Sequence, residues 1–282
     1  MPQSPNVAIF LEGSVSDLLK AYRSGQITPD VVVEHIVTAS AAIAENPIWI
    51  TPPDHARLQG YLDRLADTEP DSLPLWGVPF AVKDNIDTVD TPSTSGSLAL
   101  LGSQPISNAF LVNQLRSAGG IMIGKAAMDE FASGGEGISG RSGRIGNAYD
   151  PNQNSGGSSG GSAVAVSANF AVLGIGTDNS GSVRVPAAFN GVYAIRPSTG
   201  LVSHSGILPR GNLDGVAGVM ARSIPDLALG LAAIANRSDP DDALTTPVPR
   251  TATYGNHLKD ASLDGKRIGI VRSVAGNQVF DE

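Results

Sequence analysis

Helical segments that alternate with short apolar strands are the feature that most restricts the fold of this chain. Residues 108–120, "NAFLVNQLRSAGG", predict a helix with a glycine stop, and the apolar run "IMIGK" follows directly. Residues 162–178, "SAVAVSANFAVLGIGTD", repeat this order, and "LWGVPFAVK" at residues 75–83 predicts a buried strand that ends at Lys83. Helices that alternate with buried strands are typical of an α/β architecture.

The beginning of the chain is predicted to be helical. Residues 14–25 place apolar side chains at helical spacing and end in a glycine. Residues 28–44 begin with Thr28 as the expected N-cap and Pro29 at the first helical position. A polar helical stretch covers residues 55–67. We therefore expect a helical arm before the first buried strand.

The composition predicts a globular protein and disfavours several kinds of partner. Of the 282 residues, 41% are hydrophobic and 16% are charged, which allows a packed core. The net charge of -8, spread along the chain, disfavours direct nucleic-acid binding, and the absence of cysteine removes thiolate catalysis and disulfides. The N-terminus has no secretory signal pattern, and the longest apolar segment, about 15 residues, is too short to span a bilayer. We expect a cytoplasmic protein without membrane contact.

A segment rich in Gly, Ser and Asn, residues 133–161, interrupts the pattern of helices and strands. A loop of this length inside a domain is usually functional or disordered, so a flexible linker is one interpretation. Phosphate binding is a second, but no G-x-x-x-x-G-K-[ST] motif is present. Gly135, Gly137 and Gly140 fit G-x-G-x-x-G, although no strand is predicted before them and no helix directly after them. The segment therefore gives little support to a nucleotide site.

Nucleophilic catalysis by serine is a third interpretation of the same segment. Gly157, Ser159 and Gly161 match the nucleophile elbow G-x-S-x-G. An elbow should follow a strand, whereas a long polar loop precedes this one. Its base would have to be a histidine, and His204 is the one suitable candidate.

A lysine offers another way to activate a serine. A neutral amine can take the proton of a serine hydroxyl where no histidine is available. Lys83 suits this role because it ends an apolar strand, where burial would lower its pKa. The alternative is a surface lysine that pairs with Asp84 or Asp87.

Three blocks of the sequence together resemble the amidase signature family of serine hydrolases. They are "GVPFAVKDNID", "SGGSSGGSAVAVSA" and "GTDNSGSVRVPAAFNGVYAIRPSTG", in the family's order and spacing. The resemblance is close over residues 76–200 and looser over the helical start and residues 206–231. It implies an α/β/α fold in which a central mixed sheet is covered by helices on both faces. It also implies an amidase that needs neither a metal nor a cofactor.

The resemblance assigns a Ser-cisSer-Lys triad to this chain. Ser182 is implied as the nucleophile, Ser158 as the bridging serine that follows a cis peptide, and Lys83 as the base. Ser159 is implied as a supporting hydroxyl. In this scheme Ser158 relays the nucleophile's proton to the lysine and helps to return a proton to the leaving amine. The glycines permit a sharp loop, and the serines form the relay.

The turn before the implied nucleophile is expected to hold the oxyanion. The resemblance places the oxyanion hole at Asn179, Ser180 and Gly181, where backbone donors would stabilise a tetrahedral intermediate. Ser180 departs from the family, in which glycine is common here, so either the hole is altered or the position needs no left-handed backbone. Asp178 is expected to order the turn by accepting backbone hydrogen bonds. Arg184 is expected to pair with Asp178 or to form an ordinary surface ion pair.

We expect residues 1–282 to form a single domain that is incomplete at its C-terminus. Residues 1–70 would be its helical arm and residues 76–200 its catalytic core, and "GKRIGIVRS" near the end predicts one more strand. The main hypothesis is an amidase that hydrolyses a non-peptide carboxamide through an acyl-enzyme, with a lean towards allophanate-type and small amides over aryl or peptide amides. The alternatives are the family's amidotransferase subunit, which passes ammonia from glutamine to a mischarged tRNA, and a truncated, inactive relative. A small-molecule amide is the expected partner, and homo-oligomerisation is left open.

Overall fold

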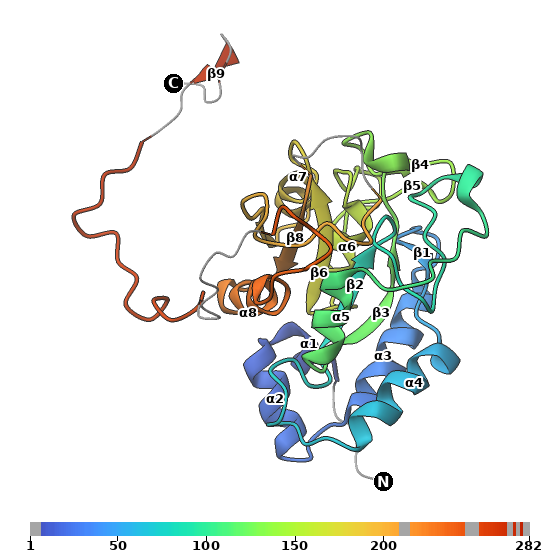
Figure 1. Ribbon diagram of the computed structural model, residues 1–282, viewed down its shortest axis with the longest axis vertical. Coiled ribbons are helices and arrows are strands. Elements are labelled where there is room, and N and C mark those ends of the chain that lie inside the picture. Colours follow the sequence, from blue (N-terminus) through green and yellow to red (C-terminus); the bar gives the residue numbers. More distant parts are fainter. Residues whose placement is uncertain (1–6, 209–214, 246–253, 270–272, 275–276, 279–282) are drawn as a thin grey trace.

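The computed structural model describes residues 7–208, 215–245, 254–269, 273–274 and 277–278. A six-stranded mixed sheet lies at its centre in the order β1-β3-β2-β6-β8-β7, with helices against both faces (Figure 1). The expected α/β/α fold class is therefore confirmed. The helices are α1 (Val7–Glu12), α2 (Val15–Arg23), α3 (Pro29–Ala42), α4 (His55–Ala66), α5 (Phe110–Ser117), α6 (Gly160–Ser167), α7 (Arg184–Phe189) and α8 (Ile224–Ala235). The sheet strands are β1 (Trp49–Thr51), β2 (Pro79–Lys83), β3 (Ile121–Ala126), β6 (Leu173–Asp178), β7 (Tyr193–Ile195) and β8 (Val216–Ala221).

Helices α2, α3 and α4 form where the sequence predicts helices, but the expected arm of residues 1–70 is not wholly helical, because strand β1 of the central sheet lies within it. Helices α1 to α4 gather at one end of the molecule (Figure 1). The Thr28 side chain accepts the Val31 N–H at 3.4 Å, and Pro29 is the first residue of α3. Helix α2 ends just before Gly25, whose φ of 67° suits a helix stop.

Three neighbouring strands of the sheet run parallel and bring their carboxyl ends to one edge. β2 pairs with β3 on one side and with β6 on the other, and every residue of these strands is buried. Helix α6 packs across all three. Lys83 ends β2 and Asp178 ends β6, so the strands place both residues at the same edge. In open α/β sheets this carboxyl edge is where ligands bind.

The Gly/Ser-rich segment is folded, so the linker interpretation is wrong. Its residues 133–161 include the strand pair β4 (Ile138–Ser139) and β5 (Gly143–Arg144), and they lead directly into α6. Ser155 and Ser158 are fully buried. The segment folds back on itself, because the Ile145 N–H donates to the Gly137 carbonyl at 2.8 Å. Its small side chains thus allow close packing beneath the carboxyl edge of the sheet.

The predicted final strand, residues 265–273, is only partly described. Residues 265–269 form no strand, residues 270–272 lie outside the described residues, and Ser273 begins a short strand. The short pair β9 (Ser273–Val274) and β10 (Asn277–Gln278) follows. The domain boundaries proposed above stay a prediction. Within the described ranges, no helix is both long and apolar enough to cross a membrane.

Candidate active site

Lys83 is buried at the end of β2, with its amine among hydroxyl and carbonyl oxygens. The residue has 0% exposed surface. Its Nζ lies 2.7 Å from Ser158 Oγ, and it donates to Thr177 Oγ1 at 2.9 Å and to the Thr177 carbonyl at 3.2 Å. The alternative of a surface lysine is therefore wrong. Asp84, its neighbour in sequence, instead lies 3.8 Å from Lys125 Nζ.

The bridging-serine candidate, Ser158, lies in the last turn of the Gly/Ser segment, directly before α6. The Gly157–Ser158 peptide is cis, as the resemblance implies. Ser158 has no exposed surface, and its Oγ faces the Lys83 amine. The next residue, Ser159, ties this turn to the neighbouring one because its N–H donates to the Ser182 carbonyl at 3.0 Å.

Ser159 itself is held by the backbone of β6. Its Oγ donates to the Thr177 carbonyl and accepts the Thr177 N–H, each at 3.3 Å. Both the hydroxyl proton and a lone pair are thereby used within the fold. This arrangement fits a supporting hydroxyl and leaves the nucleophile-elbow interpretation without a free serine.

Ser182 lies in the turn between β6 and α7, 7% exposed. The structure therefore brings the three implied triad residues to one edge of the sheet: Lys83 from β2, Ser158 from the turn before α6, and Ser182 from the turn after β6. Within the described part of the chain, no direct hydrogen bond joins the Ser158 and Ser182 hydroxyls. The Ser159–Ser182 backbone hydrogen bond is what holds the two turns together.

Asp178 organises the turn that carries Ser182. Its fully buried carboxylate accepts the N–H groups of Gly181 at 2.7 Å, Val183 at 3.0 Å and Arg184 at 3.3 Å. Arg184 adds Nε and Nη2 at 3.1 Å each, so the pair is bidentate. Burial raises the pKa of Asp178, but the hydrogen bonds from Arg184 and from the turn outweigh it and lower the pKa to about 2. The expected ordering role and the expected Arg184 pairing both agree with this geometry.

The serine in the expected oxyanion turn requires no special backbone conformation. Ser180 is exposed and does not have a positive φ, whereas the next residue, Gly181, has a φ of 124°. A side chain is strained in that region and glycine is not. The position that needs glycine is therefore occupied by one, and Ser180 is free to differ from the family pattern.

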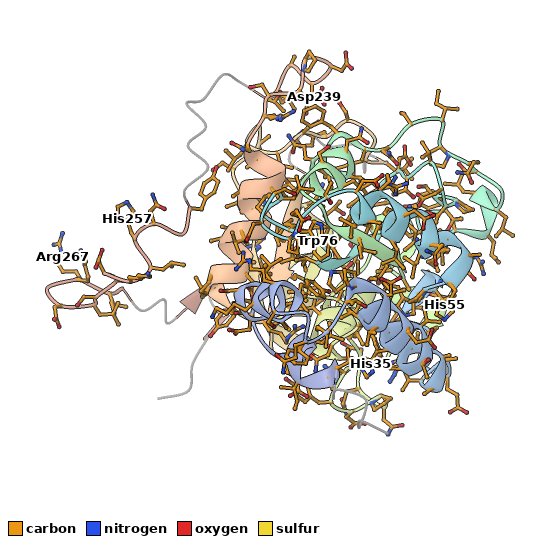
Figure 2. All side chains as sticks on the ribbon, turned by 90° about the horizontal axis from the view of Figure 1, so that it is seen from below. His35, His55, Trp76, Asp239, His257 and Arg267 are labelled. Carbon is orange, nitrogen blue, oxygen red and sulfur yellow. The ribbon has the colours of Figure 1, made fainter. Side chains whose placement is uncertain are left out.

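None of the four histidines belongs to the serine–lysine cluster. His35 and His55 lie on α3 and α4, and His257 lies in an exposed segment (Figure 2). His204 Nδ1 is 3.0 Å from Asp242 Oδ2, so this histidine is engaged with a carboxylate. The Ser159 hydroxyl is bonded to Thr177, and within the described residues no hydrogen bond joins it to His204, so the elbow interpretation also lacks a contact between serine and base. The described residues also contain no group of three or more His, Asp or Glu side chains able to hold a metal.

Sequence reasoning missed two side chains beside the lysine. Thr177 accepts two hydrogen bonds from Lys83, and Asn85 Nδ2 donates to Thr177 Oγ1 at 3.1 Å. Both stand directly beside residues that were singled out, in "VKDN" and "GTDNSG". Their pairing could not be found in the sequence because it depends on the adjacent, parallel strands β2 and β6.

The fold and the cluster define a class: an α/β protein whose candidate active site is a buried lysine beside two serine-bearing turns. The chain belongs to the amidase family, whose family model matches residues 36–281. The amidase-signature resemblance of the sequence is thereby confirmed.

Curated relatives are subunits of glutamyl-tRNA(Gln) amidotransferase. The relative from Deinococcus radiodurans is 37% identical over 94% of this chain and 54% of the relative. The protein of the same name from Archaeoglobus fulgidus is 41% identical over 72% of this chain and 43% of the relative. The chain thus spans about half the length of the curated relatives it matches.

Among solved structures, native peptide amidase from Stenotrophomonas maltophilia is similar over 87% of this chain and 52% of that one. The TM-score is 0.80 and the sequence identity is 36%. The fold and family are therefore shared by proteins that are named for two different amide reactions.

Proposed function

We propose that this chain cleaves a carboxamide C–N bond through an acyl-enzyme formed on Ser182. The observation that carries this proposal is the hydrogen bond between Lys83 Nζ and Ser158 Oγ, made where neither residue has exposed surface. Complete burial disfavours the ammonium form of a lysine, and a neutral amine can accept a proton.

The proposed reaction needs one proton relay used in both directions. Ser182 Oγ attacks the amide carbonyl while its proton passes to Ser158, and the Ser158 proton passes to Lys83. When the C–N bond breaks, a proton returns along the same path to the nitrogen, so that ammonia or an amine leaves. Water, or another nucleophile, then attacks the Ser182 ester, and its proton passes through the same relay to the departing Ser182 Oγ as the acyl group is released. Ser182, Ser158 and Lys83 thereby return to their starting states.

The backbone of the turn before Ser182 supplies the proposed oxyanion site. Asp178 fixes this turn through the amides of Gly181, Val183 and Arg184. A turn fixed before the reaction begins can stabilise a developing negative charge without reorganising. The Gly181 N–H is already bonded to Asp178, which removes it from the expected set of donors. We therefore assign the role to the backbone N–H groups of Asn179 and Ser180.

For the substrate, the comparisons favour the amidotransferase alternative over the hydrolase hypothesis. The relatives cited above at 37% and 41% identity are both named as subunits of glutamyl-tRNA(Gln) amidotransferase. We therefore propose glutamine as the amide, its ammonia being passed on within an assembly of several different subunits. The peptide amidase of similar structure supports hydrolysis of a primary amide as the second candidate. The lean towards allophanate-type amides has weaker support, and a cytoplasmic location stays a prediction.

Two measurements test the proposal. A fluorophosphonate probe should label the wild-type chain on Ser182, and Ser182→Ala should abolish both the labelling and any ammonia release. Ammonia release from glutamine that requires added partner subunits would support the amidotransferase, and equal release from small amides without partners would support the hydrolase. A wild-type chain that is folded but neither labels nor releases ammonia would contradict the catalytic proposal and favour the inactive relative.

A further inference from the structure

Asp129 is a buried carboxylate that the reaction above does not use, and we propose that it is a positioning residue that fixes Ser158 in the relay. The inference rests on the function proposed above. Asp129 follows β3, is 3% exposed, and forms no ion pair within the described ranges of the chain. A buried charge without a counter-ion must be stabilised by hydrogen bonds.

Three consecutive backbone amides supply that stabilisation. The N–H groups of Glu136, Gly137 and Ile138 donate to the Asp129 carboxylate at 3.2, 2.9 and 3.4 Å. Gly137 has a φ of 72°, which turns successive N–H groups towards one point and makes a concavity for an anion. The glycine pattern that suggested phosphate binding therefore surrounds a carboxylate of the chain itself.

The other side of Asp129 lies against the peptide that carries Ser158. The Asp129 N–H donates to the Ser158 carbonyl at 3.3 Å. A Cβ added to Gly157 would lie only 1.9 Å from Asp129 Oδ2, so the carboxylate rests on the Gly157 Cα. Asp129 thus connects loop 134–138 with the turn that carries Ser158. In that turn, Ser158 Oγ lies 2.7 Å from Lys83 Nζ.

This geometry predicts an effect on rate rather than on binding. Without the carboxylate, three amide donors would lose their acceptor, and the turn at Gly157 and Ser158 would be free to shift. A displacement of about 1 Å at a reacting group can cost about 100-fold in rate. Asp129 touches the turn and not the reacting atoms, so we expect kcat to fall while KM changes little.

The first test replaces Asp129 with a residue of the same size. Asp129→Asn keeps the contact with Gly157 but turns an NH2 group towards backbone donors. We expect fluorophosphonate labelling of Ser182, and kcat, to fall by about 10- to 100-fold with KM within about twofold. The matched control is Asp226→Asn, a carboxylate 2% exposed at the opposite edge of the sheet, where it accepts the Val15 N–H at 2.9 Å. This control should lose comparable stability and keep the wild-type labelling rate.

The second test uses two neighbouring glycines in exposed loop positions and covers the case in which Asp129→Asn does not fold. A Cβ at Gly134 would lie 2.3 Å from Asp129 Oδ1, whereas a Cβ at Gly135 would meet nothing within 4 Å. Gly134→Ala should therefore displace the carboxylate and slow labelling, and Gly135→Ala should leave the rate unchanged.

The outcomes separate this inference from the function on which it rests. Absence of Ser182 labelling in the wild-type chain would overturn the proposed function. Wild-type labelling together with an unchanged rate in Gly134→Ala, and in Asp129→Asn if that variant folds, would overturn the positioning role alone. Equal losses in Gly134→Ala and Gly135→Ala would do the same, because a general loop effect would then explain them.

Discussion

Lys83 Nζ lies 2.7 Å from Ser158 Oγ, although 75 positions separate the two residues in the chain. Lys83 lies at the end of strand β2, and Ser158 lies in the turn before α6. The packing of α6 across β2, β3 and β6 brings the two together. The relationship is therefore a product of the sheet and not of any local motif.

Removal of the amine should abolish the proposed activation. In Lys83→Met the apolar stem of the side chain is largely preserved, but no base remains. Labelling of Ser182 and ammonia release should fall by about 10²- to 10⁴-fold, the usual contribution of a general base. Labelling kinetics measure this directly. Wild-type rates in Lys83→Met combined with loss in Ser159→Ala would instead revive the elbow interpretation.

The oxyanion turn should tolerate change at Ser180 and not at Gly181. Ser180→Gly should alter kcat by less than about threefold, because Ser180 already adopts an ordinary backbone conformation. Gly181→Ala places a Cβ at a φ of 124°, 3.0 Å from Val185 Cγ2, and should lower kcat by about tenfold or more. Steady-state kinetics of both variants test the pair. A larger loss in Ser180→Gly than in Gly181→Ala would contradict this account of the turn.

Acid should weaken the fold through Asp178. Its pKa in the folded protein is lowered from 3.8 to about 2, so the folded state prefers the ionised form. The ionised carboxylate therefore adds about 2 kcal/mol to the free energy of unfolding above pH 4, and this addition is lost as the pH falls through 2. Urea unfolding at pH 7 and pH 3 should show about half of this loss in the wild type and a smaller one in Asp178→Asn. An equal pH dependence in both proteins would exclude Asp178 as its source.

The buried pair of Lys125 and Asp84 gives a second, alkaline test. Burial is the main cause that lowers the pKa of Lys125 to about 8, against the attraction of Asp84. Because the unfolded lysine binds its proton more tightly, this lysine makes stability rise between pH 8 and 10.5. Lys125→Met should remove that rise and, by leaving Asp84 unpaired, should destabilise the fold by about 3–5 kcal/mol at pH 7. Chemical denaturation of the wild type and of Lys125→Met at pH 7, 8 and 10.5 measures both effects. Unchanged stability of the variant at pH 7 would contradict a stabilising role of the pair.

Much of the fold could be predicted because the local signals agree with the final structure. The N-cap at Thr28 and the strand that ends at Lys83 are each readable from a few neighbouring residues. The three sequence blocks that resemble the amidase signature family also indicated Lys83, Ser158 and Ser182 as candidate site residues. The structure places these three residues at one edge of the sheet.

Contacts between distant segments could not be predicted in this way. The glycines at positions 135 to 140 suggested an external anion, and only the folded chain reveals that Asp129 fills the concavity. Likewise, Thr177 contacts Lys83 because two strands are adjacent, which no spacing in the sequence encodes.

Strand β2 pairs with β3 and β6 at once, so its register is locked from both sides. Side chains alternate between the two faces of a strand, and a one-residue insertion or deletion within residues 79–83 would send the amine to the opposite face. Libraries meant to change substrate choice should therefore keep the length of β2 constant.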